Sequence, residues 1–210
     1  MNLITQPTMP QLRVRVFVDF WNFTLSLKNI DEQFKVDWQI VGQVLAKEAA
    51  KIVDPNLPLI YEGMNVYGSY DPNKSRDVKL KNWFTNTLDK MAGVNVIIQP
   101  RQRKKGFPRC PQCQSEVTNC SVCESDMRGT EEKGVDTRLA TDVVSLAWAN
   151  SYNCAVLVSS DRDFVPVAEF LQTRGIKIVH GAFPPSGNAL SQKCWGHVNI
   201  PKMLNLFQRT

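Results

Sequence analysis

An aspartate closes an apolar run near the start of the chain, where a carboxylate is costly without a partner. Residues 14–18 are valines and one phenylalanine apart from Arg15, a pattern that predicts a buried strand. Asp19 ends this strand, and Asn22 follows one helical turn later. Buried carboxylates need a hydrogen-bond partner or a cation, so Asp19 is the first candidate for chemistry. Asn22 can point the same way, or it can be a simple turn residue.

Three further aspartates are placed so that they can meet Asp19. Asp161 and Asp163 follow a second apolar run at 154–159, which also predicts a strand, and Asp136 begins the helix that leads into it. Parallel strands of an open α/β sheet bring their carboxyl ends to one edge, where such folds place their sites. We therefore expect these carboxylates to lie close together, although Asp136 and Asp161 could each also be ordinary helix N-caps.

Clustered carboxylates need neutralising. Two like charges 4 Å apart repel by about 4 kcal/mol at an effective dielectric constant of 20. Either some of the groups take up protons or a cation binds. Oxygen ligands suit a hard ion such as Mg²⁺ or Mn²⁺, which activates water and stabilises charge on phosphate oxygens. The predicted metal ligands are thus Asp19, Asp136, Asp161 and Asp163.

Asp142 is a secondary candidate for the same site. It lies six residues after Asp136 on the predicted helix, and six steps of 100° place it about 120° away around the helix axis. The two side chains therefore do not share a face. Asp142 also stands four residues after Arg138, a spacing that favours an ion pair along the helix.

The elements between these residues alternate between strand and helix patterns. This alternation predicts a mainly parallel sheet with helices on both faces, that is, a three-layer α/β/α fold. We expect a loop or short helix at 24–34. Further strands are predicted at 59–67, 94–99, 176–180 and 197–200, and helices at 38–53, 73–91, 134–152, 164–173, 188–195 and 202–208.

Length and composition suit one domain with an insertion. The chain has 210 residues, 43% hydrophobic and 21% charged, which is ordinary for a globular protein. We place the domain at 11–210 and the insertion at 100–133, where apolar periodicity stops. No apolar stretch is long enough to span a membrane and no signal peptide is recognisable at the start, so we expect a cytoplasmic location and no membrane partner.

The insertion carries four of the six cysteines as two Cys-x-x-Cys pairs separated by six residues. Such pairs can supply four thiolates to a tetrahedral structural Zn²⁺, although the separation is shorter than usual. A segment this polar has no core of its own, so metal binding would supply its folding energy. A reduced loop or a redox pair is the alternative. The predicted zinc ligands are Cys110, Cys113, Cys120 and Cys123.

A basic run leads into these cysteines. The formal net charge of the chain is +5, and five basic residues with Phe107 among them occur within nine positions that contain no acid. Basic residues with an interleaved aromatic suit phosphate contact and base stacking on single-stranded RNA. A solvated tether explains the same run. The predicted nucleic-acid contacts are Arg101, Arg103, Lys104, Lys105 and Arg109.

Three blocks together resemble the signature motifs of NYN domains, which are PIN-like nucleases. The blocks are 16–23 around Asp19, Lys133-Gly134-Val135-Asp136 with Leu139 and Asp142, and 160–164 around Asp161 and Asp163. The resemblance implies a Rossmann-like PIN fold and metal-dependent cleavage of RNA by a water that leaves a 5′-phosphate. It also implies that Asn22 orients Asp19 or touches a phosphate, and it allows a homodimer. The cysteine insertion and Arg162, where a small residue is common, depart from the family pattern; Arg162 could contact phosphate.

Two other classes of function compete with a metal-dependent endoribonuclease. A non-catalytic RNA-binding or adaptor module could keep the same fold, but all four aspartates are present, which favours an enzyme. A phosphatase on a related fold would need an aspartate two positions after Asp19, where Trp21 stands. Metal-free RNA cleavage usually needs histidines, of which the chain has only two.

Overall fold

The computed structural model describes residues 10–209, which build a six-stranded sheet between two helical layers. All neighbouring strands of this sheet pair in parallel, in the order β3-β2-β1-β6-β7-β8. The predicted fold class is therefore confirmed. The strands are β1 (Leu12–Asp19), β2 (Leu59–Tyr70), β3 (Val94–Pro100), β6 (Cys154–Val158), β7 (Lys177–Ala182) and β8 (Gly196–Asn199).

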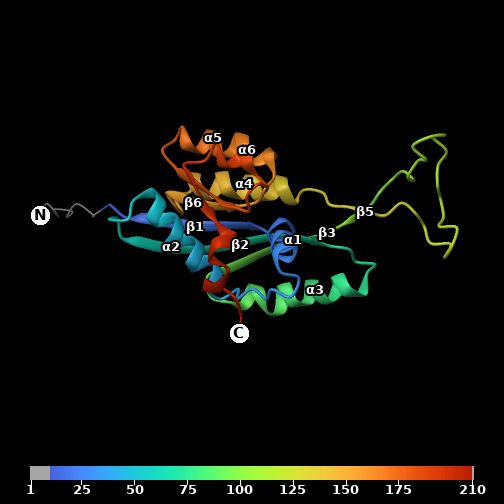
Figure 1. Ribbon diagram of the computed structural model, residues 1–210, viewed down its shortest axis with the longest axis horizontal. Coiled ribbons are helices and arrows are strands. Elements are labelled where there is room, and N and C mark those ends of the chain that lie inside the picture. Colours follow the sequence, from blue (N-terminus) through green and yellow to red (C-terminus); the bar gives the residue numbers. More distant parts are fainter. Residues whose placement is uncertain (1–9, 210) are drawn as a thin grey trace, which may run out of the picture.

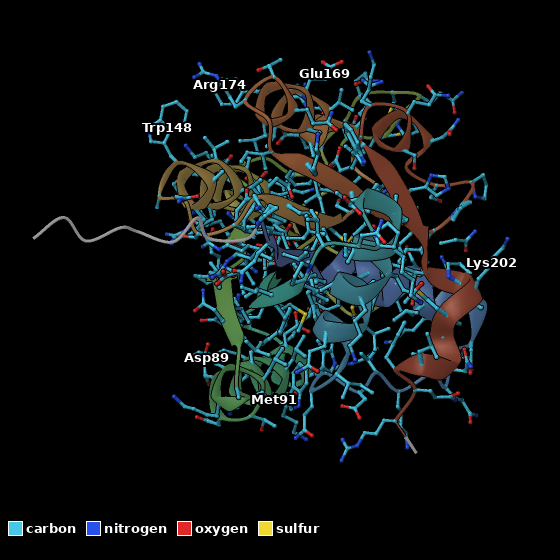
Figure 2. The ribbon with its side chains drawn as sticks, turned by 90° about the vertical axis from the view of Figure 1, so that its left-hand side faces the viewer. Asp89, Met91, Trp148, Glu169, Arg174 and Lys202 are labelled. Atoms are coloured by element: carbon cyan, nitrogen blue, oxygen red, sulfur yellow. The ribbon has the colours of Figure 1, made fainter. Side chains whose placement is uncertain are left out.

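Helices cover both faces of the sheet (Figure 1). One layer contains α1 (Phe20–Ile30), α2 (Val41–Val53) and α3 (Ser75–Asn86), with the short 3₁₀ helices η1 (Leu88–Lys90) and η3 (Ile200–Leu206). The other contains α4 (Val135–Trp148), α5 (Val165–Gln172) and α6 (Asn188–Ser191), with η2 (Arg162–Phe164) before α5. In Figure 2, Trp148, Glu169 and Arg174 project from one layer and Asp89 and Met91 from the opposite one.

The central strand β1 is buried on both faces, which explains its nearly continuous apolar sequence. Val14, Val16 and Val18 pack into the core under α1, α2 and α3. Phe17 points to the opposite face and packs edge-on against Tyr152 in the core under α4 and α5. The strand that carries Asp19 is thus held rigidly from both sides.

The order of the strands reverses at β1. The chain runs from β1 to β2 and β3 on one side, and then returns to β6, β7 and β8 on the other. Open α/β sheets form a crevice at such a reversal, at the carboxyl ends of the two strands that flank it. Asp19 ends β1, and Asp161 and Asp163 follow β6, so the predicted site lies at this crevice.

Some predicted boundaries were wrong. The stretch expected to be a loop or short helix belongs largely to α1, which begins at Phe20 because Asp19 caps it directly. The helix expected at 134–152 ends at Trp148, and Asn150 adopts a left-handed conformation with φ of 53°. The helix expected at 73–91 divides into α3 and η1, and the last expected helix is the 3₁₀ helix η3.

The inserted segment, residues 100–133, extends away from the sheet and the helices (Figure 1). Its two arms pair as a short antiparallel ribbon of β4 (Gln102–Arg103) and β5 (Thr130–Glu131). Between these strands the segment consists of turns and isolated bridges. Within residues 10–209, no helix has both the length and the apolar character needed to cross a membrane.

Candidate active site

Asp19 is both the last residue of β1 and the N-cap of α1. Its Oδ1 accepts a hydrogen bond from the backbone N–H of Asn22 at 3.1 Å, and its Oδ2 accepts one from the Ser159 hydroxyl at 3.3 Å. Burial raises the pKa of Asp19 to about 6, opposed by the Asn22 hydrogen bond and assisted by the negative charges of Asp136 and Glu132. The hydrogen bonds therefore do not offset the loss of water around this carboxylate.

Asn22 joins the first helix to the loop that follows β6. Its side-chain Oδ1 accepts a hydrogen bond from the backbone N–H of Ser160 at 3.0 Å. The Asn22 side chain therefore positions this loop, whereas its backbone N–H orients Asp19. The loop carries Asp161 and Asp163, so Asn22 fixes the two strand ends relative to each other.

The Ser159 hydroxyl links the same two strand ends. It donates to Asp19 and accepts the backbone N–H of Asp161 at 3.2 Å. Asp161 in turn caps η2, because its Oδ1 accepts the backbone N–H of Asp163 at 2.9 Å. Asp163 and Arg162 are exposed at the rim. Asp161 is thus an N-cap, but one whose position is set by the residues around Asp19.

Asp136 lies in the first turn of α4, which begins after Gly134 in a left-handed conformation with φ of 80°. Partial desolvation raises the pKa of Asp136, and the negative charges of Glu132, Asp161 and Asp163 raise it further. The start of α4 therefore lies beside the loop after β6. We call Asp19, Asp136, Asp161 and Asp163 the carboxylate site.

The carboxylate site has an excess of negative charge. Among residues 10–209, no Lys or Arg forms a salt bridge with any of its four aspartates. In the same described part of the chain, no three His, Cys, Asp or Glu side chains are arranged to hold one metal ion. The carboxylates are thus close enough to repel one another but are not closed around a single centre.

Asp142, the secondary candidate, has a different environment. Both of its oxygens lie within 3.0 Å of Arg138 Nε, and the Tyr67 hydroxyl donates to Oδ2 at 3.1 Å. This is the ion pair along α4 that the sequence spacing favours. Because Arg138 neutralises it, Asp142 does not add to the unpaired charge of the carboxylate site.

Glu132 is a carboxylate that the sequence analysis missed. It follows β5 on the returning arm of the inserted segment, and its charge raises the pKa of both Asp19 and Asp136. Its neighbours Glu131 and Lys133 make the stretch look like a solvated charge run. The one sequence signal is its position directly before the Lys133-Gly134-Val135-Asp136 block.

Three of the five predicted nucleic-acid contacts are ion-paired. Lys104 and Lys105 are exposed and form no salt bridge within the described residues. Phe107 is covered by the Arg128 guanidinium, 4.9 Å from the ring centre. The paired residues are Arg101 with Glu132 (3.6 Å), Arg103 with Asp126 (3.7 Å) and Arg109 with Glu116 (3.0 Å).

The two cysteine pairs form the same turn twice. The N–H of Gln114 donates to the Cys110 carbonyl and that of Glu124 to the Cys120 carbonyl, each at 2.9 Å. Gln114 and Glu124 both adopt positive φ, at 61° and 57°. All four cysteines are free thiols. Each turn brings two cysteines together, but the described structure does not gather three of them at one point.

Hydrogen bonds favour the thiolate form at the second cysteine of each turn. The Ser115 hydroxyl and backbone N–H, with a contribution from Cys110, lower the pKa of Cys113 to about 7. Ser125 lowers the pKa of Cys123 in the same way. Because the thiolate is the form that binds metals, both turns are chemically prepared for a cation.

A parallel α/β sheet with unpaired carboxylates at its strand reversal defines the class as a Rossmann-like protein with an acidic site. The family model of the NYN domain matches residues 13–200, so the chain belongs to the NYN domain family, which is part of the PIN-like nuclease superfamily. A solved structure of a protein of unknown function from Vibrio parahaemolyticus is similar, with a TM-score of 0.58 and 14% identity. The match covers 97% of this chain and 100% of that one and shows the fold. No curated protein matches the sequence.

Proposed function

We propose that this NYN domain is a divalent-metal-dependent endoribonuclease that hydrolyses phosphodiester bonds of single-stranded RNA. The observation that carries the proposal is the carboxylate site. Three separate elements bring four aspartates to the strand reversal, and no basic side chain of the described residues neutralises them. Membership in a nuclease-like family supports a reaction at phosphate.

The donor set suits Mg²⁺ or Mn²⁺. All of the side chains are oxygen donors, and the pKa of Asp19 is raised to about 6, as expected for a carboxylate that lacks a positive partner. Asp136 and Asp163 are exposed, so their side chains can change rotamer without disturbing the core. We infer that such movements would close the carboxylates around the ion.

When bound, the cation would lower the pKa of a water molecule and stabilise charge on the phosphate. The protein supplies position. Asp19 is fixed by Asn22 and Ser159, and it would be the immobile ligand, with Asp136, Asp161 and Asp163 as its partners. Arg162, exposed between the two rim aspartates, would contact a phosphate of the bound strand.

Cleavage of labelled single-stranded RNA in the presence of Mn²⁺ tests the proposal. Wild type should cleave internally, and Asp19→Asn should lose activity by a factor of at least about 100 because it removes the fixed carboxylate. Asp31→Asn is the matched control, since Asp31 is exposed and caps the far end of α1, about 16 Å along that helix. RNA binding without cleavage by wild type would instead identify an adaptor module.

We further propose that the four cysteines of the inserted segment bind one structural Zn²⁺. The two identical turns would each supply two thiolates, and the lowered pKa of Cys113 and Cys123 favours the form that zinc needs. Purified protein should contain about one zinc per chain by elemental analysis. Cys110→Ser should lose it, whereas Cys154→Ser, which changes a buried cysteine of β6, should keep it.

The inserted segment is the proposed grip for single-stranded RNA. Its exposed and unpaired lysines, Lys104 and Lys105, would make the phosphate contacts, with weaker contributions from the ion-paired Arg101, Arg103 and Arg109. Homodimerisation and a cytoplasmic location, both expected at the outset, stay predictions. Sedimentation analysis of the purified chain would decide the first.

A further inference from the structure

Both arms of the inserted segment are attached to the end of β2. The outgoing arm is held by the backbone N–H of Arg101, which donates to the Tyr70 carbonyl at 2.7 Å. The returning arm is held by the Thr130 hydroxyl, which lies 3.4 Å from the buried Asp71 carboxylate. β4 and β5 then pair the two arms with each other. The base of the segment therefore has a fixed position at the same edge of the sheet as the carboxylate site.

A chain of three side chains strengthens this attachment. The buried Ser69 hydroxyl donates to the Glu132 carboxylate and accepts a hydrogen bond from Arg101 Nε at 3.0 Å. Arg101 Nη2 also lies 3.6 Å from Glu132 Oε2. The Ser69 carbonyl accepts the Trp21 indole N–H at 2.9 Å, two residues after Asp19. Glu132 is thus connected to the inserted segment, to β2 and, through β2, to α1.

Glu132 has two electrostatic neighbours of opposite sign. On one side is the Arg101 guanidinium. On the other are Asp19 and Asp136, whose protonation its charge favours. A carboxylate that served only to attach the inserted segment would gain nothing from a position beside two other acids, where repulsion weakens the attachment. The position makes sense if the charge of Glu132 communicates with what binds at the carboxylate site.

We propose that Glu132 is a positioning residue that couples the inserted segment to the carboxylate site. Without a cation, repulsion from the site holds Glu132 on Arg101. A cation bound among the aspartates attracts Glu132 and so weakens its hold on Arg101. The Arg101 side chain, which is 34% exposed, then becomes available to a phosphate of the RNA strand. Cation binding and RNA binding each strengthen the other by the same factor. This inference rests on the proposed cation site.

The test measures RNA affinity rather than cleavage. A fluorescein-labelled single-stranded RNA with phosphorothioate linkages is titrated with the full chain, with and without Mn²⁺, and its intact length is checked on a denaturing gel. We expect Mn²⁺ to raise the RNA affinity of wild type about tenfold and that of Glu132→Gln less than about twofold. Gln keeps an acceptor for Ser69, so the fold is preserved.

Glu131→Gln is the matched control, because it removes an equal charge from the same arm, where Glu131 pairs with Lys133 at 2.8 Å. It should keep the full effect of Mn²⁺. Arg101→Gln should lose the effect, and adding Glu132→Gln to it should change nothing more.

The possible results separate this inference from the proposed function. If Mn²⁺ acts equally on wild type, Glu132→Gln and Glu131→Gln but not on Asp19→Asn, the coupling is wrong and the cation site stands. If Mn²⁺ affects neither wild type nor Asp19→Asn, the cation site is wrong and the coupling fails with it.

Discussion

Replacing Asp19 by Asn should stabilise the folded protein at neutral pH, because the carboxylate is held where its charge is unfavourable. Raising the pKa of Asp19 from 3.8 to about 6 corresponds to a cost of about 3 kcal/mol once the group is fully ionised. Asn still caps α1, but the hydrogen bond from Ser159 is weakened, at a cost of about 1 kcal/mol. The net gain in the free energy of unfolding is about 2 kcal/mol, or about 4–8 °C in Tm.

The pH dependence of this gain identifies its cause. Below pH 3.8 the carboxyl group is protonated in the folded and the unfolded chain, so it costs nothing. Between pH 3.8 and about 6 the unfolded chain ionises first, so the stability of wild type falls as pH rises and then stays level. The advantage of Asp19→Asn should therefore appear at pH 7.5 and be absent at pH 4.

Urea unfolding in metal-free buffer at both pH values is the assay. Asp31→Asn, which changes an exposed cap, should stay within about 0.5 kcal/mol of wild type at either pH. Mn²⁺ should stabilise wild type at pH 7.5 and leave Asp19→Asn unchanged, since a cation removes the same repulsion. A loss of stability in Asp19→Asn that is equal at both pH values would refute the reasoning, because it would show that the ionised carboxylate is well stabilised.

Two further predictions concern the inserted segment and the loop after β6. Changing Lys104 and Lys105 together to Ala should reduce the salt dependence of RNA binding by a slope of about 1.4, at about 0.7 per lost contact, whereas Arg103→Ala with Arg109→Ala should reduce it less because both arginines are ion-paired. Gly187→Ala should lower the free energy of unfolding by about 1–3 kcal/mol in urea titrations, since φ is 72° and the new Cβ would lie 2.8 Å from His180; Gly175→Ala, with φ of 82° and open space, should cost only about 1 kcal/mol.

The sequence was sufficient to predict the sheet and the position of the four aspartates relative to it. Strand β1 is recognisable because both of its faces are buried, so its sequence is apolar almost throughout. Asp19, Asp136 and Asp161 are recognisable because each stands at the end of such a strand or at the start of a helix. These features are local, and the rules for parallel sheets then bring them to one edge without further information.

Pairings between distant residues were beyond prediction. Ser69 and Glu132 are 63 positions apart, and neither stands in a pattern that distinguishes it from a neighbouring polar residue. The basic run looked uniform, yet Arg103 and Arg109 are paired with acids of the inserted segment whereas Lys104 is not. Which charges remain free depends on how the two arms fold back on each other, and the polar sequence of the segment does not specify this.

Polar contacts hold the loop after β6 firmly, yet none of them brings positive charge to the site. Asn22 accepts the N–H of Ser160, and His180 Nε2 donates to the Ser159 carbonyl at 2.8 Å while its Nδ1 accepts from Ser191. Burial lowers the pKa of His180 to about 4, so this histidine is neutral at pH 7.

Compensation for the carboxylates must then come from protons or from a bound cation. Since the pKa of Asp19 is about 6, protons leave it below neutral pH. A cation is what remains at pH 7.5. The rigid loop keeps the Ser159 contacts to Asp19 and Asp161 in place for that cation, which is the arrangement expected when a site is preorganised to bind a charge it does not itself contain.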